Sequence, residues 1–147
     1  MYPNCRLEDI VVSLELAKKL KENNIEYPTL FYWRIWDDGS IDCADEEDDF
    51  DYTGKGKEVV EEIPTYDVTI LVDNLPASVK CDDKYFDLTI YKSDFGDGYV
   101  VQYERINNDK IDVLQDFEGK RLVDILAKMR IWLEIQKDKR CFGVKKK

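Results

Sequence analysis

The segment Lys120–Lys137, KRLVDILAKMRIWLEIQK, predicts the best-defined element of this chain. Its apolar side chains recur at the i, i+3, i+4 and i+7 positions of an amphipathic helix. They are Leu122, Ile125, Leu126, Met129, Trp132 and Leu133, and the stripe is widened by Val123, Ala127 and Ile131. A helix this apolar has to be largely covered by other elements, so we expect a sheet to pack against it.

Two shorter helices are expected upstream. Leu14–Asn23 has apolar residues at helical spacing and begins after Ser13, which caps it. A second short helix follows Thr65, which we expect to be its cap, and ends near Leu75 and Pro76.

Strands are predicted where aromatic or alternating apolar residues concentrate. These segments are Leu30–Trp36, Ile41–Cys43, Glu58–Ile63, Tyr85–Lys92, Tyr99–Ile106 and Ile111–Leu114. Asp38-Gly39 is typical of a tight hairpin turn between the first two. This order predicts an α+β fold, with a mainly antiparallel sheet of about four to six strands, about three helices and the C-terminal helix the longest. We expect a single compact domain over residues 1–147.

Composition excludes several classes of function. Of the 147 residues, 44% are hydrophobic, which suffices for one core. Histidine is absent, and this removes the commonest general base and metal ligand and every histidine-dependent catalytic triad. No segment reaches the length of about 20 apolar residues that a membrane span needs, and the N-terminus lacks a secretion signal. We therefore expect a cytoplasmic protein that does not bind membranes.

The cysteines do not form a motif. Cys5, Cys43, Cys81 and Cys141 are far apart, and none belongs to a CxxC pair. A cytosolic chain of this size rarely builds a disulfide framework, so we expect reduced and partly buried thiols.

Negative charge is concentrated in one window. The chain has 32 acidic and 22 basic residues, a net charge of −10, and nine of the acids lie between Asp37 and Asp51 without a base among them. Clustered like charge costs stability and so suggests an interaction surface. The window includes a predicted acidic loop, about residues 44–57. Its candidate partner-binding residues are Asp45, Glu46, Glu47, Asp48, Asp49 and Asp51.

The acidic window does not match a calcium loop. With Gly54 as the invariant glycine, an EF-hand would place Val60 where a bidentate glutamate is needed. With Gly39 in that role, Arg34 would take the first ligand position. Neither register fits, so we predict neither a metal nor a cofactor.

Two alternative functions remain open. Closely spaced carboxylates can imitate nucleic-acid phosphates, so the chain could be an acidic inhibitor of a host nucleic-acid-binding protein. A small metal-dependent hydrolase that uses Asp and Glu is the other alternative. The net negative charge disfavours direct nucleic-acid binding, although the tail, about residues 138–147, is basic and expected to be mobile.

A second candidate surface lies on the aromatic strand. Tyr32, Arg34 and Trp36 share one face of Leu30–Trp36, because side chains alternate along a strand. Exposed, this face would have the Trp, Tyr and Arg enrichment of protein interfaces. The alternative is that other elements cover it.

Three segments of the chain also carry a resemblance. They are Ser13–Lys21 (SLELAKKLK) leading into Leu30–Trp33 (LFYW), Ile63–Thr65 (IPT) opening a short helix that ends at Leu75-Pro76, and Leu126–Glu134 (LAKMRIWLE). Together they resemble small proteins of phages, prophages and other mobile elements of Bacteroides-like bacteria, a family with no established activity. The resemblance implies a compact α+β domain of phage origin, and it brings no catalytic residues. This chain departs from the family pattern by inserting the acidic loop between the first hairpin and Pro64.

We therefore predict a non-enzymatic, phage-like accessory protein of the host cell cytosol. It would act through contacts with a protein partner, with the acidic loop and the aromatic strand as its surfaces.

Overall fold

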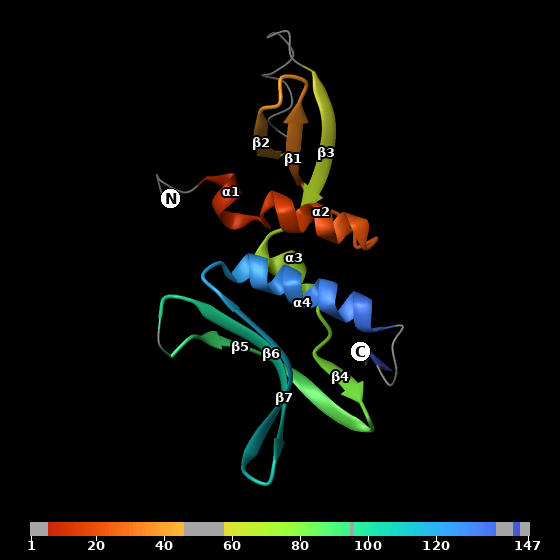
Figure 1. Cartoon of the computed structure of the whole chain (residues 1–147), viewed down its shortest axis with the longest axis vertical. Helices are drawn as coiled ribbons and strands as arrows, with labels where there is room; N and C mark the ends of the chain where they lie inside the picture. Colours follow the sequence, from red (N-terminus) through yellow and green to blue (C-terminus); the bar gives the residue numbers. More distant parts are fainter. Residues whose placement is uncertain (1–5, 46–57, 95, 138–142, 145–147) are drawn as a thin grey trace.

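The structure, a computed structural model, describes residues 6–45, 58–94, 96–137 and 143–144 (Figure 1). Its helices are α1 (Leu7–Ile10), α2 (Leu14–Glu22), α3 (Val68–Asp73) and α4 (Leu122–Gln136). Its strands are β1 (Phe31–Trp36), β2 (Ile41–Asp45), β3 (Val59–Thr65), β4 (Ser78–Cys81), β5 (Lys84–Lys92), β6 (Tyr99–Asn107), β7 (Lys110–Gly119) and β8 (Gly143–Val144).

These strands form two antiparallel sheets. The smaller has the order β2-β1-β3 and the larger the order β7-β6-β5-β4-β8. The predicted α+β class, the antiparallel pairing and the C-terminal helix as the longest are all confirmed. The described residues hold eight strands rather than about four to six, because the β-structure is divided between two sheets.

Residues with positive φ make the hairpin turns. Gly39, with φ of 86°, lies in the predicted turn between β1 and β2. Asp82 and Asp83 connect β4 to β5, and Asn108 and Asp109 connect β6 to β7. Two consecutive residues in this left-handed region give the type I′ turn, whose twist matches that of paired strands.

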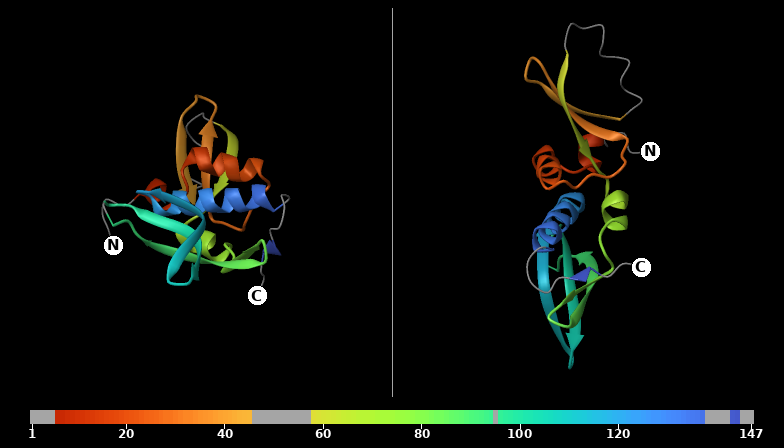
Figure 2. Two further views of the ribbon diagram at one scale, coloured as in Figure 1. Left: turned by 60° about the horizontal axis from the view of Figure 1, so that its bottom comes forward. Right: turned by 90° about the vertical axis from the view of Figure 1, so that its right-hand side faces the viewer.

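Helix α4 lies between α2 and the larger sheet and joins the two halves of the molecule (Figures 1 and 2). It contacts α2, α3, β6 and β7. Leu126 and Met129 have no exposed surface, as expected for the apolar segment that predicted this helix. The core around them includes Ile63 of the smaller sheet and Val101 of the larger one. One continuous core therefore supports both sheets.

The start of α3 corrects one prediction. Thr65 does not cap this helix, because it is the last residue of β3 and its Oγ1 donates a hydrogen bond to the carbonyl of Val12 at 2.9 Å. Asp67 is the cap, and its Oδ1 accepts from the backbone N–H of Ile70 at 3.0 Å. Pro64 lies within β3, as an edge strand allows.

Three segment boundaries also differ from expectation. Strand β7 continues past Leu114, where the prediction ended it, to Gly119. A register shift opposite Tyr103 interrupts the alternation of its side chains, and the prediction relied on that alternation. Ala44 and Asp45 belong to β2 and not to the predicted acidic loop, whose other residues, 46–57, lie outside the described residues. In the basic tail, residues 143–144 pair with β4 as β8.

Among the described residues, no helix combines the length and the apolar character needed to cross a membrane.

Candidate interaction surfaces

Two of the three residues predicted to form an aromatic binding face are buried. Arg34 is 2% exposed and Trp36 is 6% exposed. The Arg34 Nε lies 3.2 Å from Oδ1 of Asp42, directly opposite on β2, and its guanidinium carbon lies 5.4 Å from the centre of the Trp36 ring. Both side chains therefore pack within the smaller sheet, whereas Tyr32 remains half-buried at its surface.

Asp45 is the one residue of the predicted acidic surface that the structure describes. It ends β2 opposite Phe31 and is half-buried. The others, Glu46, Glu47, Asp48, Asp49 and Asp51, lie outside the described residues.

Cys43 does not have the environment of a reactive thiol. Burial, followed by the negative charges of Glu8 and Asp42, raises its pKa to about 12. A nucleophilic cysteine needs a lowered pKa, usually from a positive neighbour. Cys43 and Cys81 are both reduced thiols, whereas Cys5 and Cys141 lie outside the described ranges. The smaller sheet thus gives no support to cysteine catalysis at Cys43.

A groove of about 750 Å³ opens beside the start of β1, and we call it the aromatic groove. It is lined by residues 26–32 together with Pro64, Asp67 and Ile70. Leu30 is an exposed apolar side chain of this groove, at 58%, and Tyr32 lies close to it in the chain. Glu26 and Asp67 place two carboxyl groups in an otherwise largely apolar and aromatic lining. This combination suits an apolar ligand that carries positive charge.

Hydrogen bonds anchor the chain segment that forms this groove. The Thr29 Oγ1 donates to the carbonyl of Thr65 at 2.7 Å and accepts from the N–H of Phe31 at 3.1 Å. The Tyr27 hydroxyl accepts from Nε of Arg130 on α4 at 2.6 Å, and its ring packs edge-on against Tyr66 at 5.4 Å. The segment is thus tied to β3 and to α4, so less ordering entropy is lost when a ligand binds.

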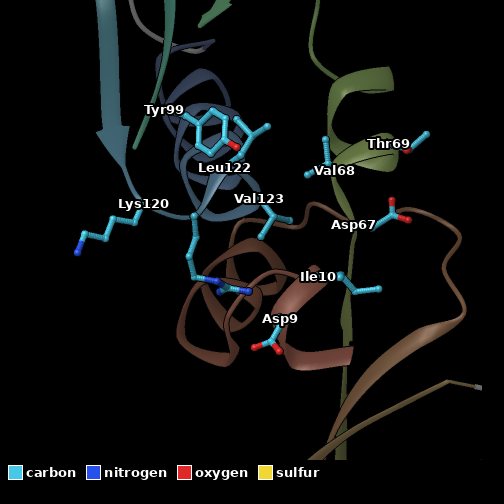
Figure 3. Close-up of a pocket in the computed structure, with 10 residues that line it drawn as sticks. Asp9, Ile10, Asp67, Val68, Thr69, Tyr99, Lys120, Leu122 and Val123 are labelled. Atoms are coloured by element: carbon cyan, nitrogen blue, oxygen red, sulfur yellow. The ribbon is translucent and has the colours of Figure 1, made fainter. Parts of the chain in front are cut away.

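A second hollow, of about 500 Å³, lies between α1, α3 and the start of α4 (Figure 3). Arg121 joins α1 to the start of α4, because its Nη2 donates to the carbonyls of Glu8 and Val11 at 2.9 and 2.7 Å. Asp9, Asp67 and Lys120 point in different directions in Figure 3. These charged groups therefore do not converge on one point, as general acid–base catalysis requires.

The β6–β7 hairpin carries exposed aliphatic side chains near its turn, and we call Ile106, Ile111 and Val113 the hairpin tip. They are 75%, 61% and 46% exposed. Ile106 and Ile111 face each other across the two strands. The hairpin extends away from α4 and the rest of the chain (Figures 1 and 2). Clustered apolar side chains on a protruding element are typical of an interaction surface.

Comparisons with protein-family models, with curated proteins and with solved structures gave no match to this chain.

Sequence reasoning placed Tyr32 at a binding surface but missed most of the groove and the whole hairpin tip. The available signal for the groove was Leu30, an apolar residue directly after Pro28 and Thr29 and before the strand. The signal for the hairpin tip was the pair of isoleucines on either side of the turn at residues 107–110. Their exposure, however, depends on which sheet face α4 covers.

Proposed function

We propose that this protein is a non-enzymatic, phage-like accessory protein that acts in the host cell cytosol by binding another protein. The aromatic groove is its contact surface. The observation that carries this proposal is the open, largely apolar lining around Leu30, held in place by a hydrogen bond to β3 and another from α4. A few central, well-packed anchor residues supply most of the energy in protein interfaces.

The charges of the groove indicate the chemistry of the bound segment. Two acidic residues, Glu26 and Asp67, line the groove, and the chain as a whole has a net charge of −10. A partner segment with an aromatic or aliphatic anchor next to Lys or Arg would therefore bind faster and more selectively than an acidic one. The non-enzymatic assignment is supported by the raised pKa of Cys43 and by the non-convergent charges of the second hollow.

Selection from a random peptide library on the immobilised protein tests this function without requiring an identified partner. We expect enrichment of peptides that combine an apolar or aromatic residue with a neighbouring Lys or Arg. Leu30→Asp should weaken the binding of the enriched peptides by about tenfold or more, as expected for the loss of an interface anchor.

Val60→Asp is the matched control. Val60 is 63% exposed, close to the 58% of Leu30, and lies on β3 outside the groove. It should bind the peptides as the unchanged protein does. Failure to enrich any peptide, or equal binding by Leu30→Asp and Val60→Asp, would contradict the proposed function.

A further inference from the structure

Strand β7 forms one edge of the larger sheet. Nine of its ten residues pair with β6 on one side, and among the described residues no strand pairs with the other side. None of these ten residues is buried, whereas four residues of β6 are. Such an edge presents a row of backbone N–H and C=O groups to which another chain can pair.

The hairpin turn determines which backbone groups point outward. Asn108 and Asp109 form a two-residue turn, in which Asn107 and Lys110 make the first hydrogen-bonded pair. From there, hydrogen-bonded and non-hydrogen-bonded residue pairs alternate along the two strands. Ile111 and Val113 belong to non-hydrogen-bonded pairs, so their N–H and C=O groups point away from β6. These groups are available to an added strand.

The exposed side chains on one face of β7 divide into an apolar half and an acidic half. Ile111 and Val113 form the apolar half, and Asp116 and Glu118 form the acidic half; all four are exposed. They share one face because they lie opposite alternate residues of β6, namely Ile106, Glu104, Gln102 and Val100.

We propose that the outer edge of β7 is a strand-addition site for an extended, basic segment of a partner protein. An antiparallel segment would place two Lys or Arg residues against Glu118 and Asp116, followed by two apolar residues against Val113 and Ile111. Opposite charges across neighbouring strands stabilise the pair, and like charges destabilise it.

A second copy of this chain is a poorer occupant of the edge. It carries the same acids on β7 and a net charge of −10, so two copies repel each other. The β7 edge shares no residue with the aromatic groove. Either surface can therefore fail its test without affecting the other.

A charge-exchange experiment with synthetic peptides tests the proposed partner chemistry. One peptide of about eight residues, within the usual strand length, has Lys at two alternating positions, then Val at two alternating positions, with Thr elsewhere. A matched peptide has Glu in place of Lys. Asp116→Lys combined with Glu118→Lys should weaken binding of the Lys peptide by about tenfold and strengthen binding of the Glu peptide by a similar factor. A Lys peptide that does not bind, or an exchange of charge that does not restore binding, would overturn the proposal.

Val113→Pro tests the backbone pairing separately. Proline removes an N–H that points away from β6, so the fold should persist by circular dichroism while binding of the Lys peptide falls about fivefold to tenfold. Val113→Thr keeps the N–H and is the control that should bind nearly normally. Binding should also slow amide hydrogen exchange at Ile111 and Val113.

Two outcomes of these measurements oppose the proposal. Undiminished binding by a folded Val113→Pro variant, together with unchanged hydrogen exchange at Ile111, would rule out strand addition. A dimer that forms without peptide in analytical ultracentrifugation and that Val113→Pro dissociates would show that a second copy occupies the edge instead.

Discussion

In the smaller sheet the polar and aromatic side chains of β1 turn inward, whereas in the larger sheet the aliphatic side chains of the hairpin tip turn outward. Arg34 is 2% exposed, and Ile106 is 75% exposed. The usual relation between polarity and burial is thus reversed at both places, because Arg34 has Asp42 as a partner and Ile106 lies near the turn of a hairpin that extends away from α4 (Figure 1). At these two positions, therefore, the polarity of a side chain does not indicate whether it is exposed.

Comparing the burial of side chains in the two sheets requires that both sheets unfold as one cooperative unit. Met129→Ala would test this with the largest effect, because Met129 is fully buried in the helix between the sheets. We expect a loss of about 3 kcal/mol in the free energy of unfolding. Hydrogen exchange in denaturant should show the same loss for the amides of β1 and β6. A loss confined to β6 would break the contrast, because the two sheets would then unfold independently.

The buried charge of the smaller sheet should contribute more to stability than a half-exposed charge of the larger one. Arg34→Ala removes the partner of Asp42, and we expect a loss of about 2 kcal/mol in denaturant unfolding. This is below the value for fully buried pairs, because the Asp42 side chain is 34% exposed. The matched control is Arg105→Ala, since Arg105 lies 3.7 Å from Asp112 with a side chain 24% exposed. Its loss should stay below about 1 kcal/mol, and equal losses would contradict the distinction.

The ion pairs at the end of α4 predict a pH dependence. Burial opposes ionisation of Glu134, but hydrogen bonds from Lys137 and Arg130 outweigh it and hold the pKa of Glu134 below its usual value. A carboxyl group with a lowered pKa stabilises the fold above its unfolded pKa, about 4.3, and this contribution disappears as the pH falls through the folded pKa. Glu134→Gln should therefore cost about 0.5–1 kcal/mol at pH 7 and progressively less in more acidic solution. A cost that stays constant between about pH 7 and about pH 3 would show that packing, not charge, is what the substitution removes.

The hairpin tip should show the smallest effect on stability. Ile106→Ser changes an exposed side chain, and we expect less than about 0.5 kcal/mol in denaturant unfolding. Val101→Ala on the same strand is the contrasting control, because Val101 is fully buried and its truncation should cost about 2 kcal/mol. If Ile106→Ser cost as much as Val101→Ala, the hairpin tip would be part of the core and would not be an open surface.

The fold was predictable where local signals and tertiary packing agree. The period of Leu122–Leu133 identified α4, and Asp38-Gly39 identified the first hairpin, because both signals act within a few residues. Ser78–Cys81 was missed because it is only four residues long and is followed by Asp82-Asp83 rather than by a glycine turn. The end of β7 was misplaced because a register shift interrupts its alternation.

The candidate surfaces were less predictable than the fold. Strand alternation placed Tyr32, Arg34 and Trp36 on one face, but it could not show that Asp42 of β2 would hold Arg34 inside the sheet. The aromatic groove joins residues 26–32 to Pro64 and Ile70, which are distant in the chain. Only the pairing of β1 with β3 brings them together.

Amide hydrogen exchange with a peptide selected from the library tests most directly whether this protein binds another protein through the aromatic groove. We expect slower exchange within residues 26–32, which line only the groove, when the peptide is bound, and unchanged exchange at the second hollow around Lys120–Val123. Slower exchange at the second hollow with no change in the groove would contradict binding through the groove.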